Sequence, residues 1–139
     1  MKKQPKIGVL YSRVRVEEKW IFAVLEQLGI DYDRLDDRKF SFDMNNPEPW
    51  LKYDAVLERS ISYARGLYST RILNAWGIPT VNTAKVAEVC GNKLATVTAL
   101  SSANVPQPET RVAYTPASAL TAIEEMGYPV VLKPMVGSW

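Results

Sequence analysis

The sequence has 139 residues, which is enough for one ordinary domain, or for one small domain and part of a second. Its 47% hydrophobic residues can form a buried core, whereas a net charge of only +2 gives no global basic field for nucleic acid. Histidine is absent and Cys90 is the single cysteine, which excludes Ser-His and Cys-His nucleophiles, an internal disulfide and a multi-cysteine metal site. We interpret Cys90 as a small core residue in a reducing compartment.

The N-terminal apolar run covers only residues 7–11. A secretory signal needs roughly 7–15 consecutive apolar residues and a membrane span needs about 20. We therefore expect a cytoplasmic chain without a membrane partner.

Strands and helices alternate along the first half of the chain. The short apolar run at residues 6–11 is typical of a buried parallel strand. The next segment has apolar residues at the spacing of one helical stripe, so we expect this stripe to face the sheet. Its members are Trp20, Ile21, Val24, Leu25 and Leu28.

Three more strands are expected at residues 30–35, 54–59 and 78–81. An irregular connection that contains two prolines spans residues 36–53, and a helix is expected over 63–76. This alternation predicts an α/β fold with an open parallel sheet.

The alternation stops after residue 83, where two helices follow each other directly. We therefore expect a domain boundary there, with one domain at residues 1–83 and a second at 84–139. The elements expected in the second domain are helices near 84–89, 92–103 and 117–126, and strands near 110–113 and 130–133.

Three glycines lie at expected helix ends, each followed by an apolar residue that begins a strand. Gly29, Gly77 and Gly127 occupy the position where a left-handed cap conformation favours glycine. Thr115 and Pro116 give the opposite signal, a hydroxyl N-cap followed by proline at the first helical position. These caps support the α/β interpretation.

Common phosphate-binding motifs are missing, but two lysines are candidates for that role. The turn after the first strand has no glycine, which argues against a dinucleotide-binding loop, and no Walker A motif occurs. Lys93 begins an expected helix and Lys133 ends an expected apolar strand. Both placements are unfavourable unless an anion compensates. The alternative is that both lysines are simply solvated.

Gly137 and Ser138 follow Lys133 closely and are typical of a small loop that wraps an anion through backbone N–H groups. The sequence ends one residue later. We therefore expect a chain that is truncated within this loop.

Arginines follow two of the expected strands. If the first and third strands are neighbours, these side chains converge beyond the carboxyl ends of the sheet, where open parallel sheets bind ligands. Arginine forks suit carboxylates and phosphates. The alternative is that they are solvated or pair with the local acids Glu17, Glu18 and Glu58. The candidates for contact with a substrate or partner are Arg13, Arg15, Arg59, Ser60 and Arg65.

The segments at 90–96, 105–110 and 127–134 together resemble the first part of the ATP-grasp fold, most closely that of the RimK-type ligases. Within these, residues 11–15, 58–60, 64–67, 77–82 and 137–139 are similar to the lysine-biosynthesis ligases that join α-aminoadipate to a small acidic amino-group carrier protein. The resemblance covers nearly all of the chain. It implies an open-sheet pre-ATP-grasp domain of Rossmann-like form, followed by the first part of an ATP-grasp α+β domain.

The resemblance also implies a chemistry. Lys93 and Lys133 match the family's two ATP-phosphate lysines, and Gly137 and Ser138 match the start of the loop that covers the nucleotide. Asn92 stands where the family often has aspartate. In this family ATP converts a carboxylate to an acyl phosphate, which an amine attacks. The full-length parent is expected to use ATP and Mg²⁺ and to be a homo-oligomer, while its metal ligands lie outside these 139 residues and this chain alone is expected to be inactive.

Two alternatives remain at this point. The parent ligase could use glutamate in place of aminoadipate, because one methylene group in a pocket is worth only about 1–3 kcal/mol. A different class of function is a non-catalytic α/β module that binds small molecules or partners through its arginines.

Overall fold

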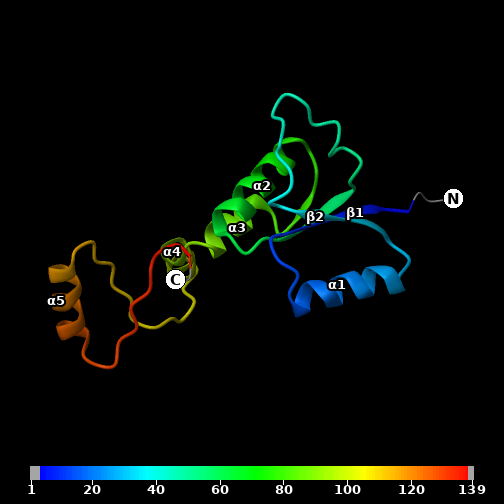
Figure 1. Ribbon diagram of the computed structural model, residues 1–139. Coiled ribbons are helices and arrows are strands. Elements are labelled where there is room, and N and C mark those ends of the chain that lie inside the picture. Colours follow the sequence, from blue (N-terminus) through cyan, green and yellow to red (C-terminus); the bar gives the residue numbers. More distant parts are fainter. Residues whose placement is uncertain (1–3, 138–139) are drawn as a thin grey trace. The chain divides into compact units, whose positions relative to one another are not determined.

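The computed structural model describes residues 4–137 (Figure 1). These residues group into two units that divide between Glu88 and Val89, whereas the boundary expected from the sequence lies between 83 and 84. Each unit is described separately below.

The first unit is built on a four-stranded parallel sheet with the order β2-β1-β3-β4. All four expected strands form, although the last is shorter than the sequence pattern indicated. The predicted open parallel sheet is therefore confirmed. Its strands are β1 at Lys6–Tyr11, β2 at Asp31–Asp36, β3 at Ala55–Arg59 and β4 at Thr80–Val81.

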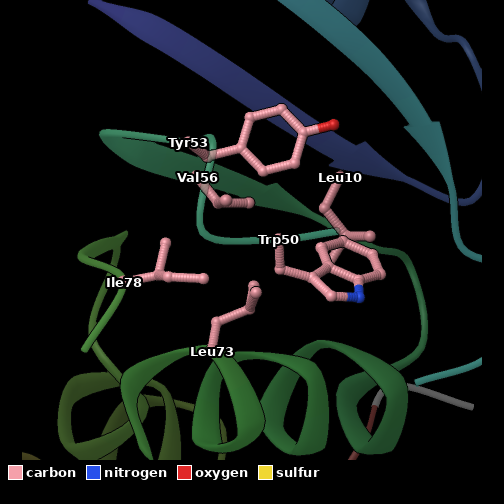
Figure 2. Close-up of a cluster of buried hydrophobic side chains, with 6 residues drawn as sticks. All are labelled: Leu10, Trp50, Tyr53, Val56, Leu73 and Ile78. Carbon is pink, nitrogen blue, oxygen red and sulfur yellow. The ribbon is translucent and has the colours of Figure 1, made fainter. Parts of the chain in front are cut away.

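Helices α1 (Val16–Gln27) and α2 (Tyr63–Ala75) cover opposite faces of this sheet. Side chains alternate between the faces of a strand, so Val9 packs with α1 while Leu10 packs with α2. Figure 2 shows the larger cluster, between the sheet and α2. It consists of Leu10, Trp50, Tyr53, Val56, Leu73 and Ile78.

The irregular connection between β2 and β3 supplies two members of that cluster. Trp50 and Tyr53 are 8% and 6% exposed, and Phe40 and Phe42 pack around Trp50 in edge-to-face and tilted contacts. A segment without regular secondary structure thus closes one side of the core.

The predicted apolar stripe of α1 is buried only in part. The side chains that α1 buries are Glu18, Phe22 and Leu25, whereas Trp20 is 67% exposed. Phe22 is drawn inward because it stacks on Tyr32 of β2 and contacts the edge of Tyr11. The contacts with β1 and β2 therefore bury a face that is rotated from the predicted stripe and overlaps it at Leu25 and Ile21. Of the predicted stripe, Leu25 is buried, Ile21 is partly buried, and Trp20, Val24 and Leu28 face solvent.

The predicted helix ends are confirmed. Gly29, Gly77 and Gly127 have φ values of 64°, 78° and 75°, which is the left-handed region that glycine adopts without strain. Helix α5 (Pro116–Met126) begins with proline, and the Thr115 hydroxyl accepts a hydrogen bond from the backbone N–H of Ser118.

The second unit contains α4 (Lys93–Ser102) and α5, and the short helix α3 (Ala84–Cys90) runs across the boundary. The strands expected near 110–113 and 130–133 are not formed. A strand requires hydrogen bonds with a neighbour, and in residues 4–137 the second unit has only an isolated antiparallel bridge between Asn92 and Val136. Val131 and Leu132, predicted to be in a buried strand, are 76% and 67% exposed.

Cys90 is exposed at the end of α3, so its interpretation as a core residue is wrong. Helix α3 buries none of its residues, which leaves no core at this position. None of the helices that the structure describes is long and apolar enough to cross a membrane.

Candidate functional site

The carboxyl ends of β1 and β3 lie side by side in the centre of the sheet. Tyr11, the last residue of β1, pairs with Arg59, the last residue of β3. The chain leaves β1 towards β2 on one side and leaves β3 towards β4 on the other, so this edge is the switch point of the sheet. The expectation that the first and third strands are neighbours is therefore confirmed.

At this edge Arg15 and Arg59 are held by one buried carboxylate. The Glu18 side chain is fully buried, and its Oε1 accepts hydrogen bonds from Arg15 Nη2 at 2.7 Å and from Arg59 Nε at 3.0 Å. Its Oε2 accepts from Arg15 Nε at 3.0 Å and from the Arg15 backbone N–H at 2.9 Å. Glu18 thereby ties the start of α1 to the end of β3.

The charge of Glu18 is stabilised by these partners. Hydrogen bonds from the Arg15 side chain, and then from its backbone and from Arg59, outweigh the cost of burial and lower the pKa of Glu18 to about 2. The two arginines share Glu18, and Glu17 Oε2 lies 3.9 Å from Arg15 Nε as a second, exposed acid. The arginine side chains are 40% and 35% exposed and remain accessible to a further anion.

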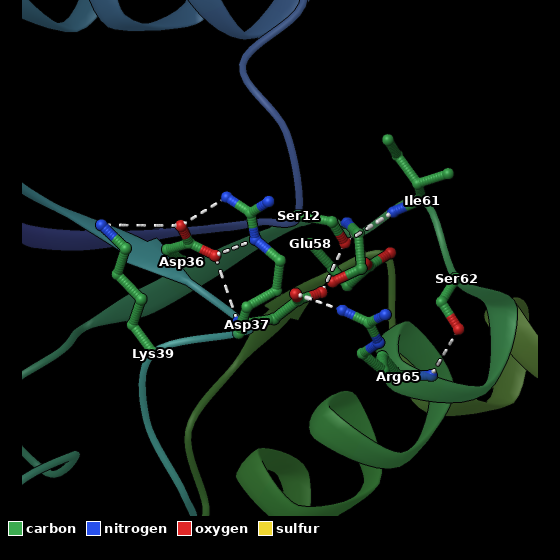
Figure 3. Close-up of polar contacts among 10 residues, drawn as sticks. Ser12, Asp36, Asp37, Lys39, Glu58, Ile61, Ser62 and Arg65 are labelled. Carbon is green, nitrogen blue, oxygen red and sulfur yellow. Dashed lines mark hydrogen bonds and ion pairs between the residues drawn. The ribbon is translucent and has the colours of Figure 1, made fainter.

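A second polar network joins Arg65 to the loop after β1 (Figure 3). The Ser12 hydroxyl donates to Asp37 Oδ2 at 2.5 Å and accepts from the Ile61 backbone N–H at 3.1 Å. Arg65 Nη1 donates to Asp37 Oδ1 at 2.9 Å, and the Asp37 side chain is only 3% exposed. The segments that follow β1, β2 and β3 are therefore linked through Asp37.

Glu58 lies beneath the start of α2 and is half-buried. Burial raises its pKa, opposed by the Ser60 backbone N–H, which donates to Glu58 Oε1 at 2.5 Å. A Cβ at Gly66 would lie 2.7 Å from the same oxygen, so glycine is what allows α2 to approach this carboxyl group. The Ser60 hydroxyl oxygen is buried and has no hydrogen-bond partner among residues 4–137.

Because Glu58 and Gly66 lie so close together, we expect the effect of Gly66→Ala on stability to have opposite signs in the presence and in the absence of the Glu58 side chain. Gly66→Ala should destabilise the chain, because the new methyl group displaces the Glu58 carboxylate from Ser60. In a Glu58→Ala background the same change should stabilise it by about 0.5–1 kcal/mol, the usual preference for alanine within a helix. Urea unfolding of the four proteins in this double-mutant cycle measures the coupling. Equal effects of Gly66→Ala in both backgrounds would contradict the prediction.

The structure thus brings the predicted arginines to one edge but gives three of them acidic partners. Arg15 and Arg59 meet on Glu18, and Arg65 binds Asp37. Arg13 is exposed and forms no ion pair within the described part of the chain.

Two residues that organise this edge were not among the candidates from the sequence. Glu18 was considered only as a local partner, although it is the third residue of α1, where a capping side chain is common. Asp37 was missed altogether. Its signal is its place directly after β2, at the same carboxyl edge of the sheet.

In the second unit, Lys93 is bound to the chain segment that contains Gly137. Its Nζ donates to the Gly137 carbonyl at 2.6 Å, and its backbone N–H donates to the Met135 carbonyl at 2.8 Å. Asn92 caps α4 by accepting a hydrogen bond from the Ala95 backbone N–H. Lys93 therefore stands at the N-terminus of α4 beside Gly137, with its Nζ and its backbone N–H both donated to carbonyl oxygens.

For the other phosphate-binding candidates, Lys133 and Ser138, the structure gives no contact that supports the role. Lys133 was expected at the end of a buried strand, where its charge would need an anion. It is instead exposed and follows a segment that is not a strand, so its charge needs no such partner. Ser138 lies outside the described residues. Within residues 4–137 no three acidic or cysteine side chains group together as the ligands of a metal ion.

Comparison with known proteins places this fold in a family. Residues 7–89, more than half of the chain, match the LysX preATP-grasp domain. The chain is 34% identical over 134 residues to the glutamate–LysW ligase ArgX of Sulfurisphaera tokodaii, and 33% identical over 135 residues to the α-aminoadipate–LysW ligase LysX of the same organism. Each alignment covers 96% of this chain and 47% of the relative.

A solved structure agrees with these relatives. The crystal structure of a RimK domain ATP-grasp protein from Sphaerobacter thermophilus superposes with a TM-score of 0.80 at 28% identity, over 96% of this chain and 50% of that protein. The chain thus spans about half the length of the relatives that it matches. The open parallel sheet and the long family match lead to the same conclusion: the chain belongs to the LysX preATP-grasp domain family.

Proposed function

We propose that this chain is the amino-terminal part of an ATP-dependent ligase that joins an amino dicarboxylic acid to a LysW-type carrier protein. The observation that carries the proposal is the similarity of nearly the whole chain to two LysW ligases, with the family match across the first unit. The arginine edge and the Lys93 turn supply the cationic groups that such a reaction needs.

In the proposed reaction, the terminal phosphoryl group of ATP is transferred to a carboxylate of the carrier, which gives an acyl phosphate and ADP. The amino group of the second substrate then attacks the acyl carbon, phosphate leaves, and an amide bond forms. This chemistry needs no protein nucleophile, because positioning and charge stabilisation lower the barrier. We assign Lys93 and Lys133 to the phosphate groups, with Gly137 and Ser138 at the start of the covering loop.

The arginine edge is proposed to contact the acidic carrier or the dicarboxylic substrate. Arg13 is fully available for this, and Arg15, Arg59 and Arg65 keep exposed N–H groups beyond those used by Glu18 and Asp37. The buried Ser60 hydroxyl directly follows Arg59, has no hydrogen-bond partner among residues 4–137 and is a further candidate donor or acceptor.

We propose aminoadipate as the amino acid, with glutamate as the alternative. The identity to the relative that uses each acid is almost equal, 33% and 34%. The two acids differ by one methylene group. Competition between them on the carrier, with the full-length ligase and ATP and mass spectrometry of the product, distinguishes the two.

Loss of either lysine is expected to slow the ligase strongly. In the full-length enzyme, Lys93→Ala and Lys133→Ala should each lower kcat by about 10²–10³, the usual effect of removing one group that stabilises transition-state charge. ATP-dependent mass gain on the carrier measures this, and Lys85→Ala, at a lysine of α3, is the control. Unchanged turnover in Lys133→Ala would show that the phosphate assignment is wrong. If no carrier product forms but dicarboxylates bind, the non-catalytic alternative is favoured.

A further inference from the structure

The arginines at the carboxyl edge of the sheet differ in which of their N–H groups are already bonded within the chain. Arg15 and Arg59 each direct Nε and Nη2, the two groups of the side-on fork, at the Glu18 carboxylate. Arg65 instead donates from Nη1 to Asp37, and within residues 4–137 its guanidinium has no other hydrogen bond. The Nε–Nη2 fork of Arg65 is therefore available, and this fork is the part of an arginine that matches a carboxylate.

Asp37 holds Arg65 from inside the fold (Figure 3). The Asp37 side chain is 3% exposed and that of Arg65 is 52% exposed, so an almost buried carboxylate fixes a guanidinium that solvent reaches. The carboxylate is itself fixed, because its Oδ2 accepts from the Ser12 hydroxyl at 2.5 Å and the Asp37 backbone N–H donates to the Tyr11 carbonyl at 2.9 Å. Arg65 is thereby ordered before any ligand arrives, whereas Arg13 has no ion pair among the described residues.

The neighbouring acid, Asp36, holds its arginine in a different way. Asp36 is 7% exposed and accepts from both Nε and Nη2 of Arg38, at 2.8 Å each, so the fork of Arg38 is used within the chain. Burial of a carboxylate requires a cation nearby, and either arrangement meets that requirement. The pair of Asp37 and Arg65 differs in leaving the fork of its arginine open, which stability alone does not require.

We propose that Asp37 is a positioning residue, which holds Arg65 through Nη1 so that the Nε–Nη2 fork of Arg65 binds a carboxylate group of a substrate. The inference rests on the proposed function, in which the acidic carrier and the amino dicarboxylic acid both carry such a group. The fork and a carboxylate form two parallel hydrogen bonds. An arginine that is already ordered loses less conformational freedom when it binds, which strengthens the complex.

Steady-state kinetics of the full-length ligase test this role, with the KM of the carrier and the KM of the amino acid measured separately. Arg65→Ala should raise one of the two KM values by about 10–100-fold, and the substrate affected identifies the source of the carboxylate. Asp37→Asn should raise the same KM by about 2–10-fold at nearly unchanged kcat, because the guanidinium must then be ordered during binding. Asp36→Asn is the matched control. It removes the same charge from the same edge without releasing Arg65, and it should raise neither KM.

Two more variants separate positioning from a merely structural role of Asp37. The double variant Arg65→Ala with Asp37→Asn should have the same KM as Arg65→Ala alone, because Asp37 acts through Arg65. Ser12→Ala keeps the charge of Asp37 but loosens its carboxylate, so it should raise the same KM by less, and it decides the question if circular dichroism shows that Asp37→Asn is unfolded. Unchanged KM values in Arg65→Ala, equal effects of Asp36→Asn and Asp37→Asn, or additive effects in the double variant would overturn the inference.

Calorimetry without ATP makes the result independent of ligation. The probes are glutarate, a small dicarboxylate, and a tetraglutamate peptide, an acidic chain. At least one of them should bind the unmodified full-length protein about 10–100-fold more tightly than it binds Arg65→Ala. This difference in a protein that forms no carrier product would contradict the proposed function alone. Carrier product without this difference for either probe would overturn the inference alone.

Discussion

Replacing Leu73 with alanine is expected to lower the free energy of unfolding by about 3–4 kcal/mol. Leu73 is fully buried in α2 and packs against β1, β3 and the connection that carries Trp50 (Figure 2). Truncation removes the transfer free energy of its methyl groups and leaves a cavity, since the strands on the other side of the cluster cannot collapse into the space.

Equilibrium urea unfolding followed by tryptophan fluorescence measures the Leu73 effect, because Trp50 belongs to the same cluster. Leu51→Ala is the matched control: the same substitution at a side chain that is 49% exposed should change the stability by no more than about 0.5 kcal/mol. A loss of similar size in both variants would mean that the cluster around Leu73 is not the core that holds α2 to the sheet.

Removing Glu18 is expected to have the next largest effect on stability. Glu18→Ala leaves Arg15 and Arg59 without the anion between them and separates the start of α1 from the end of β3. Breaking a fully buried pair costs about 3–5 kcal/mol, but these arginines are partly solvated, so we expect about 2 kcal/mol. Glu17→Ala is the control, because Glu17 is the neighbouring acid of the same helical turn and is 55% exposed.

The pH dependence provides an independent measure of Glu18. Its pKa is about 2 in the folded chain, against 4.5 ordinarily, so its contribution to stability is present above about pH 4.5 and is lost as the pH falls towards 2. The stability difference between the unmodified chain and Glu18→Ala should therefore shrink over that range when unfolding is repeated from pH 6 downward. A difference that does not vary with pH would mean that the effect of the substitution is not due to charge.

Local signals along the chain predicted the first unit well. The apolar run at 6–11 became β1 with the same bounds, and the glycines after α1, α2 and α5 adopt the left-handed conformation that their positions indicated. These features depend on the residue itself and its near neighbours, which is why the sequence is sufficient to predict them.

The predictions that failed concern contacts between distant segments. The strands expected at 110–113 and 130–133 lack partners among the described residues, and an apolar run has no strand geometry without a neighbouring backbone to bond with. The buried face of α1 was misassigned, because Trp20 and Val24 have the same helical spacing as the residues that the sheet covers. Periodicity identifies an apolar stripe but not what lies against it.

The sequence by itself therefore determined the α/β order of elements in the first unit, the glycine and Thr115 helix caps, and the places of arginines directly after the first and third strands. Only the tertiary structure decided the use of those arginines. Glu18 of α1 pairs locally with Arg15, whereas the sheet order brings Glu18 to Arg59, and brings Asp37, directly after β2, to Arg65. An ion pair depends on distance and burial, which follow from how strands are ordered in space rather than from their order in the chain.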